Sequence, residues 1–223
     1  MAGGGHSPGR LAVTAPDRRT ADGVHPVAAP QITGVILAGG QGRRMGSIDK
    51  GLQALQGKPM VEHVIERFAP QVHELLINAN QNLDRYARFG HRVIPDEIGG
   101  FAGPLAGLQR GLREAAHALV ATAPCDSPFL PDDLVARLLV ALQDNRADLA
   151  VARTGTQPHP VFSLCRRTLL DNLTRYLAGG GRKIDAWYAP LRVIEVAFDD
   201  QPEAFSNINT EAELRAMEKH AAG

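Results

Sequence analysis

From position 32 onward, short apolar runs alternate with segments whose apolar residues recur at helical spacing. Met60, Val64 and Phe68 recur in this way after Pro59, which favours a helix there. Strands that are regularly separated by helices indicate a mostly parallel sheet covered on both faces, so we expect an α/β, Rossmann-like three-layer sandwich. The pattern predicts strands over 32–37, 75–77, 91–95, 118–123 and 149–152, and helices over 82–89 and 131–142 and from Pro59 and Pro104 onward.

The C-terminal half of the chain is less regular. Its apolar runs predict strands over 160–164 and 191–197, and its helical spacing predicts helices over 168–177 and 182–188. The segment Thr210-Glu211-Ala212-Glu213 is a capping box and predicts the start of a final helix.

The first 31 residues differ in composition from the rest. They are rich in glycine, alanine and proline, and their longest apolar stretch is Leu11-Ala12-Val13. A secretory signal needs a continuous apolar centre of about 7–15 residues. We therefore expect 1–31 to be a disordered N-terminal extension without a signal, followed by a single domain over 32–223.

The charge balance excludes some classes of partner. The chain has 24 Lys and Arg against 24 Asp and Glu, which predicts no binding to nucleic acid or to an anionic membrane.

Cys125 and Cys165 are too few for a disulfide framework or a zinc cluster, and they favour a reducing, cytoplasmic location. No apolar run approaches the ~20 residues that span a bilayer.

The strand expected over 32–37 ends in a glycine-rich segment that carries cations. Four glycines, at positions 39, 40, 42 and 46, are interleaved with Arg43 and Arg44 and followed by Lys50. Glycine lets backbone N–H groups approach an anion and the cations neutralise it, which suits a triphosphate. The segment matches neither the dinucleotide fingerprint nor the Walker loop. It therefore predicts a third kind of phosphate site, with a surface loop as the alternative.

Polar residues follow three further predicted strands, where ligands collect in open α/β sheets. The carboxamides of Asn78-Ala79-Asn80 could meet the edge of a base, or simply lie in a turn. Asp96 could accept from a ribose hydroxyl or a guanine N–H edge. Asp126 could hold Mg²⁺, which needs only one or two carboxylates, or could cap a helix ahead of Pro128. Cys125 has no nearby histidine in the sequence to activate it, which favours a packing role.

Two motifs carry a resemblance to a known family. The segment from Leu37 to Lys50, LAGGQGRRMGSIDK, resembles the opening signature of the nucleotidyltransferases. Within that superfamily the chain from Ile32 onward is most similar to the molybdenum cofactor guanylyltransferases. Leu-Ala-Gly-Gly at 37–40 and Gly-Pro-Leu-Ala-Gly at 103–107 resemble the markers of guanosine-using members, and 205–210 resembles the family segment F-x-N-(I/V)-N-T.

The resemblance implies a function. It implies transfer of GMP from GTP to the terminal phosphate of Mo-molybdopterin, with Mg²⁺ as cofactor. A nucleotide half over about 32–130 would be followed by a cofactor half over about 131–223. The partners that the resemblance implies are molybdenum-insertion and molybdoenzyme-maturation proteins. The alternatives are a molybdopterin cytidylyltransferase or a sugar-phosphate nucleotidyltransferase, and a non-catalytic carrier of nucleotide or cofactor.

The resemblance also implies roles for individual residues. His159 and the glycine run before Arg182 and Lys183 could line the cleft for the second substrate, although a structural role for His159 is equally open. The implied catalytic residues are Arg44, Lys50 and Asp126, with Asp126 as metal ligand. The implied nucleotide-binding residues are Leu37, Ala38, Gly39, Lys50, Asn78, Asp96 and Asp126, and the implied cofactor-binding residues are Asn207, Asn209 and Arg182.

Overall fold

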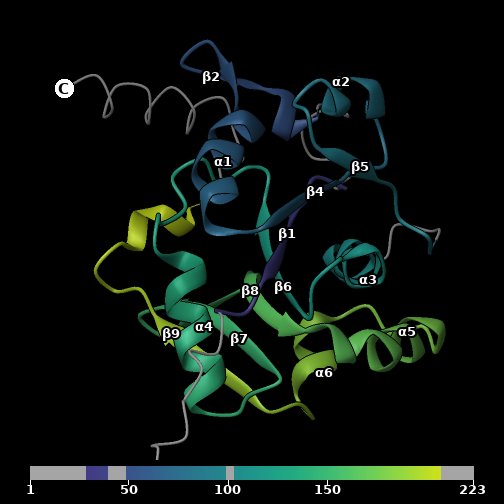
Figure 1. The fold of residues 1–223 in the computed structure, drawn as a ribbon, viewed down its shortest axis with the longest axis vertical. Coiled ribbons are helices and arrows are strands. Elements are labelled where there is room, and N and C mark those ends of the chain that lie inside the picture. The colour runs from purple at the N-terminus through teal and green to yellow at the C-terminus, as the bar shows by residue number, and fades with distance from the viewer. Residues whose placement is uncertain (1–28, 40–48, 99–102, 207–223) are drawn as a thin grey trace, which may run out of the picture.

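The protein is built on one seven-stranded sheet (Figure 1). The structure is a computed structural model that describes residues 29–39, 49–98 and 103–206. Within this sheet all strands run parallel to their neighbours except β8, which is antiparallel to both of its neighbours. Across the sheet the strands are β5 (Arg92–Ile94), β4 (Glu74–Asn78), β1 (Ile32–Leu37), β6 (Leu119–Pro124), β8 (Gln157–Arg166), β7 (Leu149–Thr154) and β9 (Val193–Ala197).

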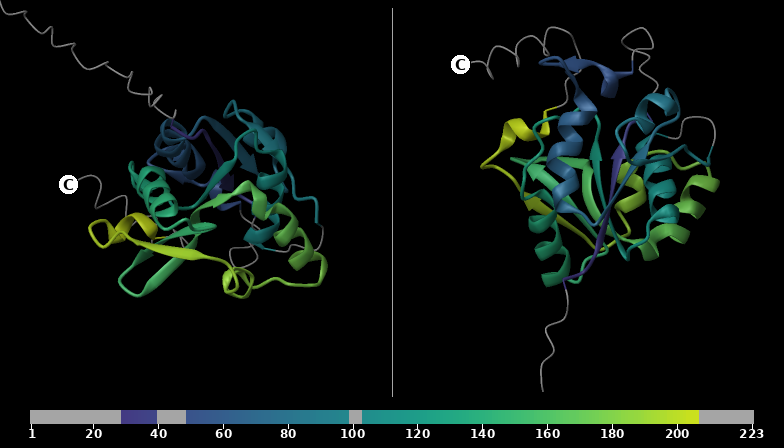
Figure 2. Two further views of the ribbon diagram at one scale, coloured as in Figure 1. Left: turned by 60° about the horizontal axis from the view of Figure 1, so that its bottom comes forward. Right: turned by 45° about the horizontal axis from the view of Figure 1, so that its top comes forward.

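Helices cover both faces of this sheet and confirm the predicted three layers (Figure 2). Successive residues of the buried strand β1 point to opposite faces, so that Ile36 packs with α1 and α4 while Val35 packs with α3, α5 and α6. The covering helices are α1 (Met60–Phe68) and α4 (Leu134–Asp144) on one face, and α3 (Pro104–Glu114), α5 (Leu170–Ala178) and α6 (Ile184–Tyr188) on the other.

The short elements between these helices and strands include some that the sequence did not predict. A hairpin of β2 (Ala54–Leu55) and β3 (Lys58–Pro59) precedes α1, and its turn places Gln56 and Gly57 at positive φ. Strands of two residues are too short to show an alternating pattern, so the hairpin was missed. The remaining elements are α2 (Leu83–Ala87) and the 3-10 turns η2 (Lys50–Leu52), η3 (Ala69–Gln71), η4 (Arg167–Leu169) and η5 (Pro202–Phe205).

Strand β8 is longer than the predicted 160–164, and its reversal shapes the carboxyl edge of the sheet. Its pairing with β6 ends at Thr122 and Ser163, whose hydroxyls lie 2.9 Å apart. The register of its pairing with β7 shifts between Val151 and Ala152, and the pairing then continues to Thr154. The last residues of β6 therefore have no partner on β8, and the two strands separate just before Asp126.

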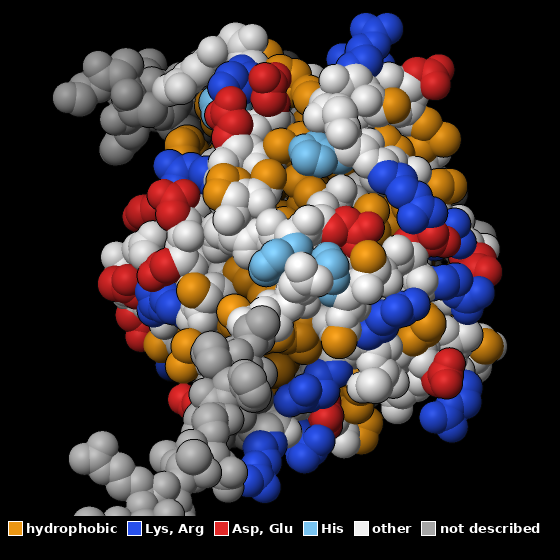
Figure 3. Space-filling model, viewed as in Figure 1, with side chains coloured by type: hydrophobic (Ala, Val, Ile, Leu, Met, Phe, Trp, Pro, Cys, Tyr) orange, Lys and Arg blue, Asp and Glu red, His pale blue; other side chains and the backbone are white. Residues whose placement is uncertain are grey.

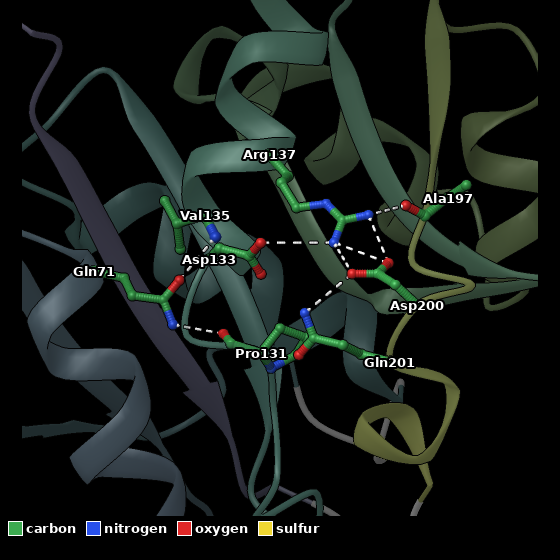
Figure 4. A network of polar contacts seen from close by, with 8 residues as sticks. All are labelled: Gln71, Pro131, Asp133, Val135, Arg137, Ala197, Asp200 and Gln201. Carbon is green, nitrogen blue, oxygen red and sulfur yellow. Dashed lines mark hydrogen bonds and ion pairs between the residues drawn. The ribbon is translucent and has the colours of Figure 1, made fainter.

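Polar contacts fasten α4 to the segments on either side of it (Figure 4). Gln71 accepts a hydrogen bond from the Val135 N–H at 2.9 Å, which satisfies a donor in the first turn of α4. Further along the helix, the Arg137 guanidinium binds both carboxylate oxygens of Asp200, at 3.0 and 3.1 Å, and lies 3.9 Å from the ring centre of Phe198. The helix is thus joined to η3 and to the segment after β9.

Charged side chains of both signs are interspersed on the face shown in Figure 3, in keeping with the balanced composition. Across 29–39, 49–98 and 103–206, no helix is long and apolar enough to cross a membrane. The predicted extension falls, up to residue 28, outside the described residues, and so does the predicted final helix.

Candidate functional site

Four strands end in register at one edge of the sheet. Leu37 of β1 pairs with Asn78 of β4 and with Pro124 of β6, and Asn78 also pairs with Ile94 of β5. The pairing continues one step beyond the strands, where the Ala38 N–H donates to the Asn78 carbonyl at 2.8 Å. Because the strands end level with one another, the polar residues that follow them are carried to a common edge, as expected for a ligand site in this type of sheet.

Lys50 and Asp126 meet at this edge. The Lys50 Nζ lies 3.3 Å from Asp126 Oδ2, and 26% and 14% of the two side chains are exposed. Lys50 begins η2, whereas Asp126 lies in the turn after β6, well before α4 begins at Leu134. The helix-capping alternative for Asp126 is therefore wrong. The pair offers one cation and one carboxylate to a ligand at the strand ends.

A divalent metal fits the chemistry of Asp126. Its carboxylate is a hard oxygen ligand, and Mg²⁺ commonly takes one or two carboxylates together with substrate phosphates and water. Among the described residues, no group of three or more His, Cys, Asp or Glu is arranged to hold an ion. An ion at Asp126 would therefore share its coordination with the phosphates of a substrate.

Two asparagine side chains surround Asp96 at the ends of β4 and β5. Asn78 Nδ2 donates to Asp96 Oδ1 and Asn80 Nδ2 donates to Asp96 Oδ2, both at 2.8 Å. The Asp96 N–H donates in turn to Asn80 Oδ1 at 2.8 Å, and Asn78 Nδ2 also reaches the Ile94 carbonyl at 3.1 Å. We call Asn78, Asn80 and Asp96 the carboxamide cluster. Asn80 belongs to the predicted polar segment 78–80, although a nucleotide contact was expected of Asn78 alone.

The carboxamide cluster occupies space that is open because Gly39 and Gly107 have no side chains. A Cβ on Gly107 of α3 would lie 2.2 Å from Asn78 Oδ1, and a Cβ on Gly39 would lie 3.1 Å from the same atom and 2.9 Å from Asn80 Nδ2. Side-chain atoms do not approach this closely, so a larger residue at either position would displace an amide. Both glycines belong to the motifs that resemble guanosine-user markers.

Cys125 lies between Pro124 and Asp126 and faces the interior. Burial, with the neighbouring Asp126 carboxylate adding to it, raises the pKa of the Cys125 thiol. The thiol therefore stays protonated and is a poor nucleophile at neutral pH, which agrees with the predicted packing role.

His159 takes part in an aromatic cluster near the end of β7. Its Nε2 lies 2.7 Å from Thr154 Oγ1, and its ring stacks on Phe205 with centres 4.9 Å apart. Burial lowers the pKa of the imidazole. Phe205 also packs against Phe162 and Phe198. These contacts hold His159 in the aromatic cluster, next to the segment that leads to Asn207.

The remaining predicted residues are not joined to this edge by described contacts. Arg182 donates to the carbonyls of Leu177 at 3.0 Å and Gly181 at 2.7 Å, so its guanidinium covers the C-terminal end of α5. Arg44, Asn207 and Asn209 lie outside the described residues.

The mostly parallel sheet, with a lysine and a carboxylate paired at its carboxyl edge, defines the class of this protein, which is a nucleotidyltransferase. Residues 34–192 match the family model of the MobA-like NTP transferase domain. The chain belongs to the molybdenum cofactor guanylyltransferase family.

Similar sequences and a similar solved structure support this membership. The chain is 53% identical over 197 residues to the molybdenum cofactor guanylyltransferase of Cupriavidus taiwanensis, covering 86% of this chain and 98% of that relative. It is 53% identical over 180 residues to that of a Shewanella species, covering 81% and 91%. A crystal structure of molybdopterin-guanine dinucleotide biosynthesis protein A from Archaeoglobus fulgidus superposes with a TM-score of 0.72 at 25% identity, covering 85% of this chain and 98% of that one.

Proposed function

We propose that this chain transfers GMP from GTP to the terminal phosphate of Mo-molybdopterin. An oxygen of that phosphate attacks the α-phosphorus of GTP, the bond from the α-phosphorus to the bridging oxygen breaks, and pyrophosphate leaves with that oxygen. The observation that carries the proposal is the Lys50–Asp126 pair, 3.3 Å apart at the strand edge that also holds the carboxamide cluster. Membership of the family supplies the identity of the two substrates.

The work of the protein in this reaction is alignment and charge neutralisation, because the nucleophile belongs to the substrate. Lys50, together with Arg44 from the glycine-rich segment, would stabilise negative charge on the α-phosphate and on the departing pyrophosphate. Backbone groups of Leu37, Ala38 and Gly39, at the end of β1, would contact the nucleotide. A preorganised donor of this kind typically contributes ~10²–10³ in rate.

Asp126 would hold Mg²⁺, which when bound neutralises the phosphate oxygens of GTP. The residue fits this role because its carboxylate stands at the strand end next to the ammonium of Lys50. Lys50 would then limit the repulsion between the Asp126 carboxylate and the incoming phosphates.

The carboxamide cluster would select the base. Each carboxylate oxygen can accept more than one hydrogen bond, so Asp96 can receive the N–H edge of guanine while it still accepts from Asn78 and Asn80. A base without that donor edge would leave buried polar groups unpaired. Such a mismatch can lower the activity with that base by about 10⁴-fold relative to guanine.

Asn207, Asn209 and Arg182 would bind the molybdopterin. For Arg182 this contact requires that its guanidinium exchange the carbonyls of Leu177 and Gly181 for oxygens of the substrate. We expect the product to pass to proteins that mature molybdenum enzymes. We expect the reaction to take place in the cytoplasm, where Cys125 and Cys165 stay reduced.

The test is a transfer assay with the full chain, α-labelled GTP, Mg²⁺ and molybdenum-loaded molybdopterin. Labelled GMP should appear on the pterin with one pyrophosphate released, and Asp126→Ala should abolish both without changing the unfolding transition. Asp132→Ala is the matched control, because Asp132 pairs with Arg67 at 3.1 Å on the exposed surface. Normal turnover by Asp126→Ala would remove Asp126 from the site, and GTP binding without transfer by the unchanged chain would favour a carrier.

A further inference from the structure

Tyr86 lies fully buried on α2, and its hydroxyl reaches the residue before Lys50. The hydroxyl donates to Asp49 Oδ1 at 2.6 Å, and Asn82 Nδ2 donates to Asp49 Oδ2 at 2.9 Å. Both carboxylate oxygens of Asp49 are thus held, one by Tyr86 of α2 and the other by Asn82, the N-cap residue of that helix. The main chain that enters η2 is fixed from the side of α2 as a result.

The residue after Lys50 packs against the same hydroxyl. A Cβ on Gly51 would lie 2.6 Å from the Tyr86 oxygen and 3.1 Å from both Cβ and Sγ of Cys125. The absence of a side chain at Gly51 therefore lets the main chain settle between Tyr86 and Cys125. Cys125 immediately precedes Asp126, so the contact spans the two halves of the Lys50–Asp126 pair.

We propose that Tyr86 is a positioning residue for phosphoryl chemistry, which acts through Asp49 and Gly51 to place the Lys50 ammonium opposite Asp126. Lys50 lies between two residues that both contact the Tyr86 hydroxyl, and its Nζ comes within 3.3 Å of Asp126. The proposal deepens the proposed function and rests on the role of Lys50 in it.

The chemistry of the hydrogen bond between Tyr86 and Asp49 suits a contact that holds the Lys50 segment in one position. Burial, the nearby Cys125 and the hydrogen bond to Asp49 together raise the pKa of Tyr86, so the hydroxyl remains a donor. A hydrogen bond from a hydroxyl to a carboxylate is shorter and stronger than one between neutral groups. Moving the Lys50 segment would leave this buried hydroxyl without its acceptor, which opposes such motion.

The alternative is that Tyr86 only fills the core, since its ring belongs to the main apolar cluster. Tyr86→Phe separates the two roles, because it keeps the ring and removes the hydroxyl. Tyr188→Phe is the matched control: its hydroxyl donates to Asp185 Oδ1 at 3.1 Å on α6, another tyrosine–aspartate pair.

The experiment is a double-mutant cycle of Tyr86→Phe with Lys50→Ala, read as kcat and KM for GTP in the transfer assay and as the Kd of Mg²⁺·GTP by calorimetry. We expect Tyr86→Phe to lower kcat about 10- to 100-fold with a smaller change in KM, because a small misplacement of a catalytic group is costly. In the Lys50→Ala background the same change should alter kcat less than about twofold. Tyr188→Phe should leave all values close to those of the unchanged chain.

The proposal is overturned if Tyr86→Phe has full activity, or if its loss is equally large with and without Lys50. If the unchanged chain binds GTP but transfers no GMP, the proposed function fails, and the Kd values of the four proteins still test the positioning role. Losses of binding free energy that are not additive between Tyr86→Phe and Lys50→Ala support that role, and additive losses refute it. If GTP does not bind at all, Lys50 meets no phosphate and both proposals fall.

Discussion

Gly107→Ala tests how the carboxamide cluster is packed. The new Cβ would lie 2.2 Å from Asn78 Oδ1 and 2.8 Å from Leu37 Cδ2, well inside normal contact distance. Asn78 is only 2% exposed, so its carboxamide cannot avoid the new Cβ by moving out into solvent. The amide must therefore rotate away from its partners.

The expected loss of stability follows from the hydrogen bonds that Asn78 would lose. These are the bond to the Ile94 carbonyl at 3.1 Å and the bond to Asp96 Oδ1 at 2.8 Å. A neutral hydrogen bond contributes about 1 kcal/mol and one to a charged group about 1.5–3 kcal/mol. Alanine in place of glycine within a helix restores about 1 kcal/mol. The net decrease in the free energy of unfolding should be about 2 kcal/mol.

Urea unfolding measures the stability, and calorimetry measures the affinity for Mg²⁺·GTP, which should fall at least about tenfold if Asn78 and Asp96 meet the base. Gly179→Ala is the control, since its Cβ would come no closer than 3.4 Å to the Arg175 carbonyl. A Gly107→Ala protein as stable as the unchanged chain, with full affinity for GTP, would mean that the Asn78 amide does not depend on the space that Gly107 leaves.

Three further predictions concern single side chains. Lys50→Ala should lower kcat by about 10²–10³ with little effect on thermal unfolding, because the lysine is partly exposed; a variant that unfolds would make Lys50 structural. Burial raises the pKa of Cys125, and that of Cys165 to about 12, so iodoacetamide at pH 8 should modify only urea-unfolded protein; rapid native modification would contradict this. Burial lowers the pKa of His159 below 6.5, so the stability from neutral His159 is present above pH 6.5 and is lost as the pH falls through the folded-state pKa. Unfolding curves of the unchanged chain should therefore lose more stability from pH 7 to 5 than those of His159→Gln, and equal losses would contradict the assignment.

The parallel half of the fold could be predicted because its pattern is local. A strand buried on both faces is a continuous apolar run, as in β1, and the helices that cover it have apolar residues at helical spacing, as in α1. Proline marked the start of α3 as predicted. These features depend on neighbouring residues and are visible in the sequence alone.

The antiparallel insertion of β8 could not be predicted in the same way. Its direction depends on pairing with β6 and β7, and the displaced register at Val151 and Ala152 leaves no mark in the apolar pattern. Sequence patterns predict that a strand exists much better than they predict its neighbours.

The sequence predicted that the polar site residues follow the ends of strands, but it did not predict which of their side chains contact one another. Lys50 and Asp126 are 76 residues apart in the sequence, and only the register of β1 and β6 brings their segments together. Tyr86 was missed, and the contact of Asn80 with Asp96 was not predicted, because both depend on where other side chains point. The packing functions of Gly39 and Gly107 likewise emerge only once the Asn78 amide is located.

The most direct test of a guanine-nucleotide site at this strand edge is calorimetry of the full chain with GTP, CTP and UTP in the presence of Mg²⁺. We expect GTP to bind tightly and the two pyrimidine nucleotides to bind at least about 100-fold more weakly. Equal affinities, or a preference for CTP or UTP, would contradict the role of the carboxamide cluster, and no binding of any nucleotide would contradict the site itself.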